Sequence, residues 1–252
     1  MADRFLEGRV AVITGAGRGI GRAIALALGG AGARLALVDR TAADTAETAK
    51  LARDAGAQCE TFGCDVREES QVRALTSEVM QRFGAVHVLV NNAGTAIRKK
   101  VHEFTLEEWR LVMDTNLTGP FLLCRHFIPH MKGRGYGRII NLTSIMAHVS
   151  SDGRGVYSAS KHGLLGLTRA LGVELAEDRI TAVAISPGFV ETDLTAVLRA
   201  DPAKSAALLA QTPLGRYAKS EEIAAAALYI CSDAAGYMTG TDMLIDGGWC
   251  AQ

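Results

Sequence analysis

The sequence predicts an α/β fold in which a doubly wound, parallel sheet of about seven strands has helices on both faces. Short runs rich in β-branched residues alternate with longer Ala- and Leu-rich segments of helical period, as in repeated strand–helix units. Strand candidates such as Ala11–Ile13 and His87–Val90 are apolar without alternation, which is typical of strands covered on both faces. No repeat, low-complexity tract or Pro/Gly/Ser-rich linker divides the chain, so we expect one domain over residues 1–252.

The first unit consists of a strand over Arg9–Ile13, a glycine-rich turn and a helix over Gly19–Leu28, in which Ile20, Ile24 and Leu28 share one face. The following strands are predicted at Arg34–Val38, Gln58–Cys64, Val86–Val90, Gly137–Leu142, Thr181–Ile185 and Met243–Ile245. The following helical segments are predicted at 42–55, 68–83, 105–132, 157–177 and 220–231.

The segment 187–219 is the longest without a clear strand or helix period, and it contains three of the five prolines. A segment of this length inside a compact domain is more often a functional lid than an inert insertion. We therefore predict a lid over the substrate that contains one short, mobile helix.

Bulk composition excludes several classes of function. The 27 basic and 27 acidic residues balance, so electrostatics favour neither nucleic acid nor an anionic membrane as a partner. No apolar run approaches the ~20 residues that span a bilayer, and the charged start MADRFLEGRV lacks the apolar core of a signal peptide. Five scattered cysteines without a CxxC pair indicate free thiols in a reducing compartment, and no His/Cys/Asp cluster indicates a metal. We expect a soluble, cytoplasmic protein.

The turn TGAGRGIG, residues 14–21, places several glycines between a strand and the start of a helix. Unpaired backbone N–H groups and a helix N-terminus then face one point, which suits a pyrophosphate. The spacing matches neither GxGxxG nor a P-loop, and a simple hinge is the alternative. The residues expected to contact the pyrophosphate are Gly15, Arg18, Gly19, Ile20 and Gly21.

Asp39 closes the second strand, 18 residues after Gly21. A carboxylate at this place accepts hydrogen bonds from an adenosine ribose diol and repels a 2′-phosphate. Arg18 and Arg40 favour NADP instead, because either could pair with that phosphate. The alternative is that both are solvated loop charges. On balance NAD is favoured over NADP as the cofactor.

Tyr157 and Lys161 lie four residues apart at the start of a helical segment and so share a face. A tyrosine is half-ionised at neutral pH only if its pKa falls by ~3 units, which corresponds to ~4 kcal/mol. An ammonium ~4 Å away supplies about that much. Tyr157 could then act as the general base for alcohol oxidation or the general acid for carbonyl reduction. The alternative is an ordinary packed pair on a helix.

Together these motifs resemble the short-chain dehydrogenase/reductase family, in its single-domain form. The matching residues are TGAGRGIG at 14–21, Asp65 and Val66, NNAG at 91–94, Asn116, Ser144, YSASK at 157–161, Pro187 and Gly188, and DGG at 246–248. Ser144 precedes Tyr157 by thirteen residues, the spacing usual in that family.

The resemblance implies a Rossmann-type sheet and a catalytic set of Asn116, Ser144, Tyr157 and Lys161. Tyr157 would exchange the proton with the substrate oxygen, and Ser144 would hydrogen-bond that oxygen. Lys161 would lower the tyrosine pKa and bind the nicotinamide ribose, and Asn116 would hold a relay water.

The resemblance also implies the remaining cofactor contacts. Asp65 and Val66 would flank the adenine. The ribose and nicotinamide side would be lined by Asn91, Ala93 and Gly94, together with Pro187, Gly188, Val190 and Thr192.

The expected substrate pocket lies between 94–100, 144–156 and the lid. Besides Ser144, we expect His148 and Arg154 to bind substrate, with Arg154 meeting a carboxylate, and Arg98 and Lys99 to add positive charge at the rim. These polar groups favour a polyol, sugar or sugar acid of the gluconate type.

Two other functions stay open. An NADPH-dependent 3-oxoacyl-thioester reductase would use Arg18 and Arg40 for the cofactor, and Arg98, Lys99 and Arg125 for an acidic carrier protein. A catalytically inactive nucleotide sensor would typically lack the Tyr157–Lys161 pair. The family resemblance further implies a homotetramer formed through the helices at 105–132 and 157–177.

Overall fold

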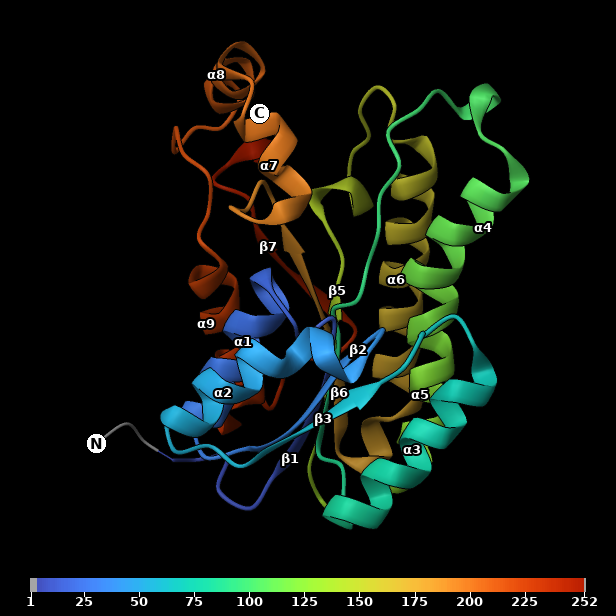
Figure 1. The fold of residues 1–252 in the computed structure, drawn as a ribbon, viewed down its shortest axis with the longest axis vertical. Helices are drawn as coiled ribbons and strands as arrows, with labels where there is room; N and C mark the ends of the chain where they lie inside the picture. The colour runs from blue at the N-terminus through green and yellow to red at the C-terminus, as the bar shows by residue number, and fades with distance from the viewer. Residues whose placement is uncertain (1–3, 252) are drawn as a thin grey trace.

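A seven-stranded parallel sheet forms the middle layer of the molecule in a computed structural model that describes residues 4–251 (Figure 1). The strands are β1 (Val10–Thr14), β2 (Arg34–Asp39), β3 (Cys59–Gly63), β4 (Val88–Asn91), β5 (Gly137–Leu142), β6 (Ile180–Pro187) and β7 (Thr241–Ile245). Their order is β3-β2-β1-β4-β5-β6-β7, and every pairing is parallel. The predicted fold class is confirmed.

Strand β1 pairs with both β2 and β4, so the chain reverses its direction of winding between these neighbours. In a doubly wound sheet the loops at the carboxyl ends of the strands diverge at this point, and ligands bind there. The glycine loop follows β1 and the NNAG turn follows β4, so both predicted cofactor motifs reach this edge.

Helices cover both faces of the sheet (Figure 1). One face packs against α1 (Gly19–Gly30), α2 (Ala46–Asp54) and α9 (Ser220–Cys231). The other packs against α3 (Glu69–Phe83), α5 (Gly119–Met131) and α6 (Gly155–Glu174). Successive strand residues such as Val12 and Ile13 face the two separate cores, which explains the apolar strands without alternation.

The predicted helical segment 105–132 is not one regular helix. It divides into α4 (Leu106–Met113), a π-helical turn over Asp114–Thr118, and α5. A Cβ on Gly119 would come 2.8 Å from Cγ2 of Val66, so the backbone passes close to the loop after β3 at the end of this turn. Single π turns are frequent at functional sites, and this one contains Asn116.

The segment 187–219 contains two helices rather than the single short helix expected from the sequence. They are α7 (Asp193–Arg199) and α8 (Pro202–Ala210). The second helix starts where Asp201 accepts a hydrogen bond from the Lys204 N–H and Pro202 occupies the first turn. Figure 1 places both helices beyond the carboxyl end of the sheet, near the C-terminus.

Of the helices in residues 4–251, none is long and apolar enough to span a bilayer. All five cysteines are free thiols, and four of them are buried. Burial raises the pKa of Cys64, Cys124 and Cys231 to about 12, so these thiols pack as small apolar side chains.

Candidate active site

The glycine loop and the NNAG turn are tied together at the switch point of the sheet. The amide of Asn92 donates to the carbonyls of Thr14 and Gly15, and the Thr14 hydroxyl accepts from the N–H groups of Asn92 and Ala93. A Cβ on Gly21 would lie 2.1 Å from the Gly15 carbonyl oxygen. Only glycine at position 21 therefore permits this tight loop.

The start of α1 lies beside the segment 187–219. Gly19 has a φ of +53°, and its β-position lies 3.3 Å from Cγ2 of Thr192. The side chain of the N-cap residue Arg18 does not cap α1, and its guanidinium instead pairs with Asp193 at 2.9 Å. The loop thus leaves the first N–H groups of α1 available for an anion beside the segment 187–219, and its residues fit a dinucleotide pyrophosphate.

Asp39 is held rigidly at the end of β2. Its carboxylate accepts from the backbone N–H of Gly17 at 3.1 Å and of Arg40 at 2.9 Å. A Cβ on Gly17 would lie 2.9 Å from Asp39 Oδ2, so glycine lets the loop close onto the carboxylate. Each carboxylate oxygen can accept further hydrogen bonds, which suits a ribose diol.

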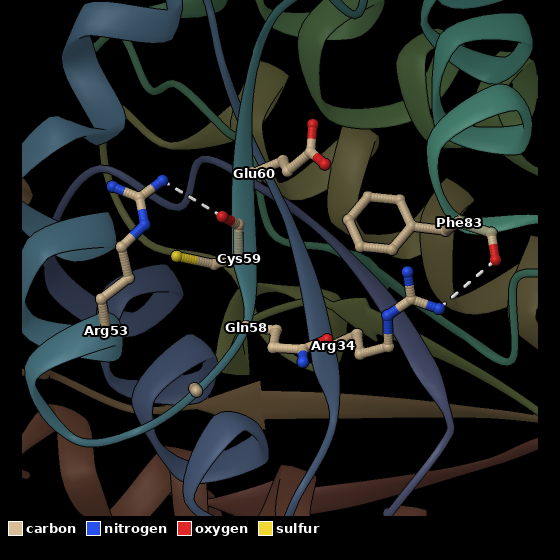
Figure 2. Close-up of a pocket in the computed structure, with 7 residues that line it drawn as sticks. Arg34, Arg53, Gln58, Cys59, Glu60 and Phe83 are labelled. Atoms are coloured by element: carbon tan, nitrogen blue, oxygen red, sulfur yellow. Dashed lines mark hydrogen bonds between the residues drawn. The ribbon is translucent and has the colours of Figure 1, made fainter.

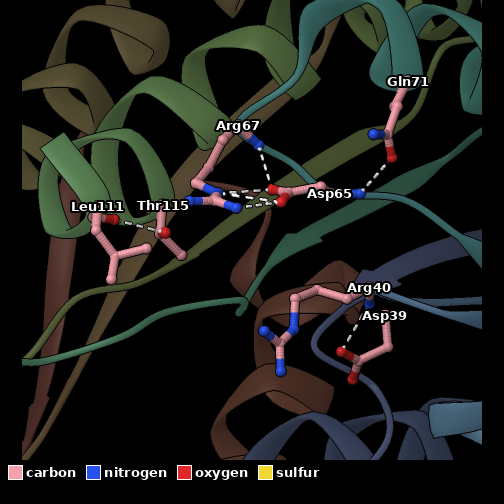
Figure 3. Close-up of polar contacts among 7 residues, drawn as sticks. All are labelled: Asp39, Arg40, Asp65, Arg67, Gln71, Leu111 and Thr115. Atoms are coloured by element: carbon pink, nitrogen blue, oxygen red, sulfur yellow. Dashed lines mark hydrogen bonds and ion pairs between the residues drawn. The ribbon is translucent and has the colours of Figure 1, made fainter. Parts of the chain in front are cut away.

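The two carboxylates that follow β2 and β3 have different environments (Figure 3). Asp65 forms a short, bidentate ion pair with Arg67, whose guanidinium holds the pKa of Asp65 below its usual range. Its backbone N–H donates to Gln71 at 2.9 Å, which fixes the loop after β3. Asp39 bonds only backbone N–H groups among the described residues, so it is the freer carboxylate.

The predicted catalytic residues Ser144 and Tyr157 meet where β5 ends and α6 begins. Tyr157 is 9% exposed, and Ser144 lies in hydrogen-bonding contact with it. Burial raises the pKa of Tyr157, whereas the Ser144 hydrogen bond and the positive charge of Arg154 act in the opposite direction.

Lys161 lies one helical turn beyond Tyr157 and is fully enclosed. Its ammonium donates to the Leu142 carbonyl at 2.7 Å and lies 5.6 Å from the centre of the Tyr157 ring. Burial lowers the pKa of Lys161 to about 8. Burial thus opposes the charged form of both side chains, but with a pKa of about 8 Lys161 still carries its charge at neutral pH.

Asn116 braces the site from the π turn. Its amide nitrogen donates to the Thr95 carbonyl and the Ser160 hydroxyl, and its Oδ1 accepts from the Thr95 N–H at 2.8 Å. The β-position of Gly94 lies 3.4 Å from this Oδ1 and 3.7 Å from Lys161 Nζ. A glycine at position 94 therefore leaves room between the two polar groups.

Asn91 faces the interior instead of the dinucleotide side. Its side-chain amide donates to Asn141 Oδ1 at 2.7 Å, between β4 and β5. Any contact of this residue with a cofactor would come from its backbone.

The residues predicted to line the nicotinamide lie at the end of β6 and the start of the segment 187–219. A Cβ on Gly188 would lie 2.8 Å from Cα of Asp246, so Pro187 and Gly188 pass closely beside the DGG turn. Val190 is buried, and Thr192 begins α7 directly above Gly19.

The side chains predicted to bind substrate differ in whether they already have partners within the protein. His148 contacts Asp242 at 2.5 Å and Ser186 at 3.3 Å, so its Nε2 already has protein partners. Lys99 forms an ion pair with Glu108. By contrast, the guanidinium of Arg154 lies 5.7 Å from the centre of the Tyr157 ring, and no described residue forms an ion pair with it.

A surface hollow of about 420 Å³ lies away from these residues, beside the starts of β2 and β3 (Figure 2). It is lined by Arg34, Arg53, Ala57, Gln58, Cys59, Glu60 and Phe83. Arg53 donates to the Cys59 carbonyl and Arg34 to the Phe83 carbonyl, so both guanidinium groups form hydrogen bonds within the protein.

Comparison with known proteins decides the family. The family model described as enoyl-(acyl carrier protein) reductase matches residues 15–250. The chain belongs to the short-chain dehydrogenase/reductase family. It is therefore an oxidoreductase that acts on alcohol groups.

Relatives of this dehydrogenase align along the whole chain. The cis-4-hydroxycyclohexanecarboxylate dehydrogenase of Sinomonas cyclohexanicum is 39% identical and covers 100% of both chains. The D-threitol dehydrogenase of Mycolicibacterium smegmatis is 40% identical over 98% of this chain and 95% of its own. The gluconate 5-dehydrogenase of Burkholderia cenocepacia, solved with NADP and tartrate, is 37% identical with a TM-score of 0.95, covering 99% of this chain and 98% of its own.

Sequence reasoning missed one wall of this dehydrogenase site. Phe189, Trp249 and Cys250 pack with Ile145 and Met146 against Tyr157. The rings of Phe189 and Trp249 meet edge to face at 5.1 Å. The only signal in the sequence was an aromatic residue directly after the DGG turn, which by itself does not show where the C-terminal segment folds.

Proposed function

We propose that the protein is an NAD-dependent dehydrogenase that interconverts a secondary alcohol and a ketone on a polyol, a sugar or a sugar acid. The main support is the buried group of Ser144, Tyr157 and Lys161 at the carboxyl edge of the sheet, beside the glycine loop. No catalytic position of the family pattern is substituted in this chain.

The chain's own residues would handle the proton. A bound nicotinamide supplies the hydride acceptor or donor. In oxidation, Tyr157 as phenolate takes the hydroxyl proton while the carbinol carbon loses its hydride, and Ser144 holds the substrate oxygen. Lys161 favours the phenolate by its charge, and Asn116 would hold a water that passes the proton to solvent. In reduction, Tyr157 returns the proton to the carbonyl oxygen.

The proposed dinucleotide contacts follow the motifs. Gly15, Gly19, Ile20 and Gly21 would bind the pyrophosphate with Arg18, and Asp65 and Val66 would flank the adenine. The nicotinamide half would be bound by Asn91, Ala93, Gly94, Tyr157, Lys161, Pro187, Gly188, Val190 and Thr192.

Asp39 supports NAD as the preferred cofactor. Its fixed carboxylate favours a ribose diol over a 2′-phosphate. A side-by-side fluorescence titration with NADH and NADPH tests this choice. Tighter NADPH binding would overturn NAD preference, and binding of neither would overturn the dehydrogenase proposal.

The substrate class is supported by similarity to dehydrogenases of threitol and gluconate. Ser144 and Arg154 remain the proposed substrate contacts. His148 would first have to release Asp242. Oxidation of threitol, gluconate and hydroxycycloalkane acids in the presence of NAD tests the class.

A 3-oxoacyl-thioester reductase is the second candidate. Arg40 and the acyl-carrier-protein reductase model favour it. Two cations that could meet a carrier protein are however paired within the chain, Lys99 with Glu108 and Arg125 with Glu69. Reduction of acetoacetyl thioesters with NADPH, faster than any alcohol oxidation, would select this reading.

We further propose a cytoplasmic homotetramer of single-domain subunits, each with 187–219 as its lid. Exposed apolar side chains support two interfaces. Leu106, Trp109 and Phe121 lie on α4 and α5, and Val173, Tyr237 and Leu244 lie around the end of α6 and β7. Contact between subunits along these elements would bury both sets of apolar side chains.

A further inference from the structure

We propose that the substrate is a hydroxy acid with an apolar carbon skeleton, whose carboxylate binds Arg154 and whose skeleton lies against Met146, Phe189 and Trp249. This inference rests on the proposed dehydrogenase function and replaces the polyhydroxylated skeleton of the proposed substrate by an apolar one.

The first support is the bonding of the loop that leads into α6. His148 pairs with Asp242, Ser150 bonds Ser158, and Asp152 forms an ion pair with Lys100. These side chains, which could otherwise bind the hydroxyls of a polyol, thus already have protein partners. Arg154 is the cation of this loop that pairs with no carboxylate in residues 4–251.

The second support is the environment of Arg154 itself. The side chain is half-buried, and the backbone bond from Lys99 N–H to the Gly153 carbonyl brings Arg98 close to it. Burial, together with repulsion from Arg98, lowers the pKa of Arg154. A partly desolvated guanidinium without a counter-charge is costly, and a ligand carboxylate supplies that charge with matching fork geometry.

The position of Arg154 fits a carboxylate near the reacting carbon. Its guanidinium carbon lies 5.7 Å from the centre of the Tyr157 ring. A substrate that places its hydroxyl at Tyr157 and Ser144 would therefore place an acid group a few bonds away at Arg154.

The third support is the apolar cluster that surrounds Tyr157, which forms one wall of the site. Ile145, Met146, Phe189, Trp249 and Cys250 pack against Tyr157, and they offer almost only apolar atoms. A skeleton with a hydroxyl on every carbon would lose hydrogen bonds to water along this wall without replacing them. A ring or chain of methylene groups would gain from the contact.

The test uses the full-length protein with NAD and a matched set of alcohols: 3- and 4-hydroxycyclohexanecarboxylate, the corresponding carboxamides, and gluconate. We expect kcat/KM for the better acid to exceed that for its carboxamide by about 10- to 100-fold, the effect of a hydrogen-bonded charge. We also expect it to exceed that for gluconate.

The variants distinguish a direct contact between Arg154 and the substrate carboxylate from the general positive potential of this region. Arg154→Gln should bring the acid-to-carboxamide ratio close to one, and Arg154→Lys should leave an intermediate ratio because the fork is lost. Arg98→Gln, which removes a neighbouring cation, should keep most of the ratio. Trp249→Ala should lower kcat/KM for the ring acid more than for gluconate.

Equal turnover of acid and carboxamide by the wild type would overturn the inference, as would a preference for gluconate, or NADH binding without turnover of either acid. A ratio lost in Arg98→Gln but kept in Arg154→Gln would also overturn it. The proposed function fails separately, if neither dinucleotide binds.

Discussion

Burial shifts the pKa values of the two ionisable side chains proposed to be catalytic in opposite directions. It raises the pKa of Tyr157 and lowers that of Lys161, so the site without cofactor favours a neutral phenol beside an amine that is easily deprotonated. Positive charge must restore the phenolate. Lys161 supplies part of it, Arg154 supplies more across the face of the ring, and an oxidised nicotinamide would add to both.

Replacing Tyr157 by Phe removes the proton-transfer atom and keeps the ring. We expect turnover to fall by about 10²- to 10⁴-fold, as for loss of a general acid or base, while NADH affinity measured by fluorescence stays unchanged. A variant that binds NADH much more weakly, with little loss of turnover, would favour a sensing role for this residue.

Lys161 also makes stability depend on pH. Its ammonium deprotonates near pH 8 in the folded protein and near 10.5 in the unfolded chain, so the unfolded state binds more protons between these values. The stability of the wild type relative to Lys161→Met should therefore rise with pH in this window, by up to about 1.4 kcal/mol per unit. Denaturant melts at several pH values measure this, with Lys50→Met on exposed α2 as the control. A difference that stays flat with pH would mean that the ammonium is solvated.

At the residue level, the spacing of the motifs predicted which side chains lie together. The end of β5 and the first turns of α6 bring Ser144, Tyr157 and Lys161 to one place, and their catalytic roles stay a prediction. The partner of His148 could not be predicted, because Asp242 lies 94 residues away and no motif links the two.

At the level of elements, alternating strands and helices were predictable from periodicity, and most boundaries agree within two residues. The π turn was not predictable from periodicity. It lies next to a tertiary contact, the close passage of Gly119 beside Val66, which periodicity does not report. The helices α7 and α8 were missed because their starts depend on local caps such as Asp201 more than on an apolar face.

The π turn can be tested through that contact. Gly119→Ala places a methyl group 2.8 Å from Val66 Cγ2, and we expect a loss of about 1–3 kcal/mol in stability. We also expect weaker NADH binding, since Val66 lies in the proposed adenine site. Gly30→Ala at the end of α1, where nothing lies within 4 Å of the added methyl group, is the matched control and should be neutral or stabilising. Equal behaviour of the two variants would show that the close passage relaxes freely.

For the whole molecule, the exposed apolar residues on α4 and α5 predict one interface of the proposed homotetramer. Trp109→Glu places a charge among Leu106 and its neighbours, and we expect the tetramer to dissociate to smaller species in light scattering coupled to gel filtration. Val197→Glu, on an exposed face of α7, is the control and should leave the molar mass unchanged. An unaltered tetramer in Trp109→Glu would remove this face from the interface.

The packing of Trp249 and Cys250 against Tyr157 has a practical consequence for handling the protein. An affinity tag or fusion partner joined on the C-terminal side of Trp249 and Cys250 would begin close to the residues that pack with Tyr157, whereas the N-terminal segment leads into the amino end of β1, at the other edge of the sheet. Kinetic constants from an N-terminally tagged preparation should therefore match those of untagged protein, and a C-terminal tag should raise KM for the alcohol. Reporter fusions, immobilisation and library display of this enzyme are best made through its N-terminus.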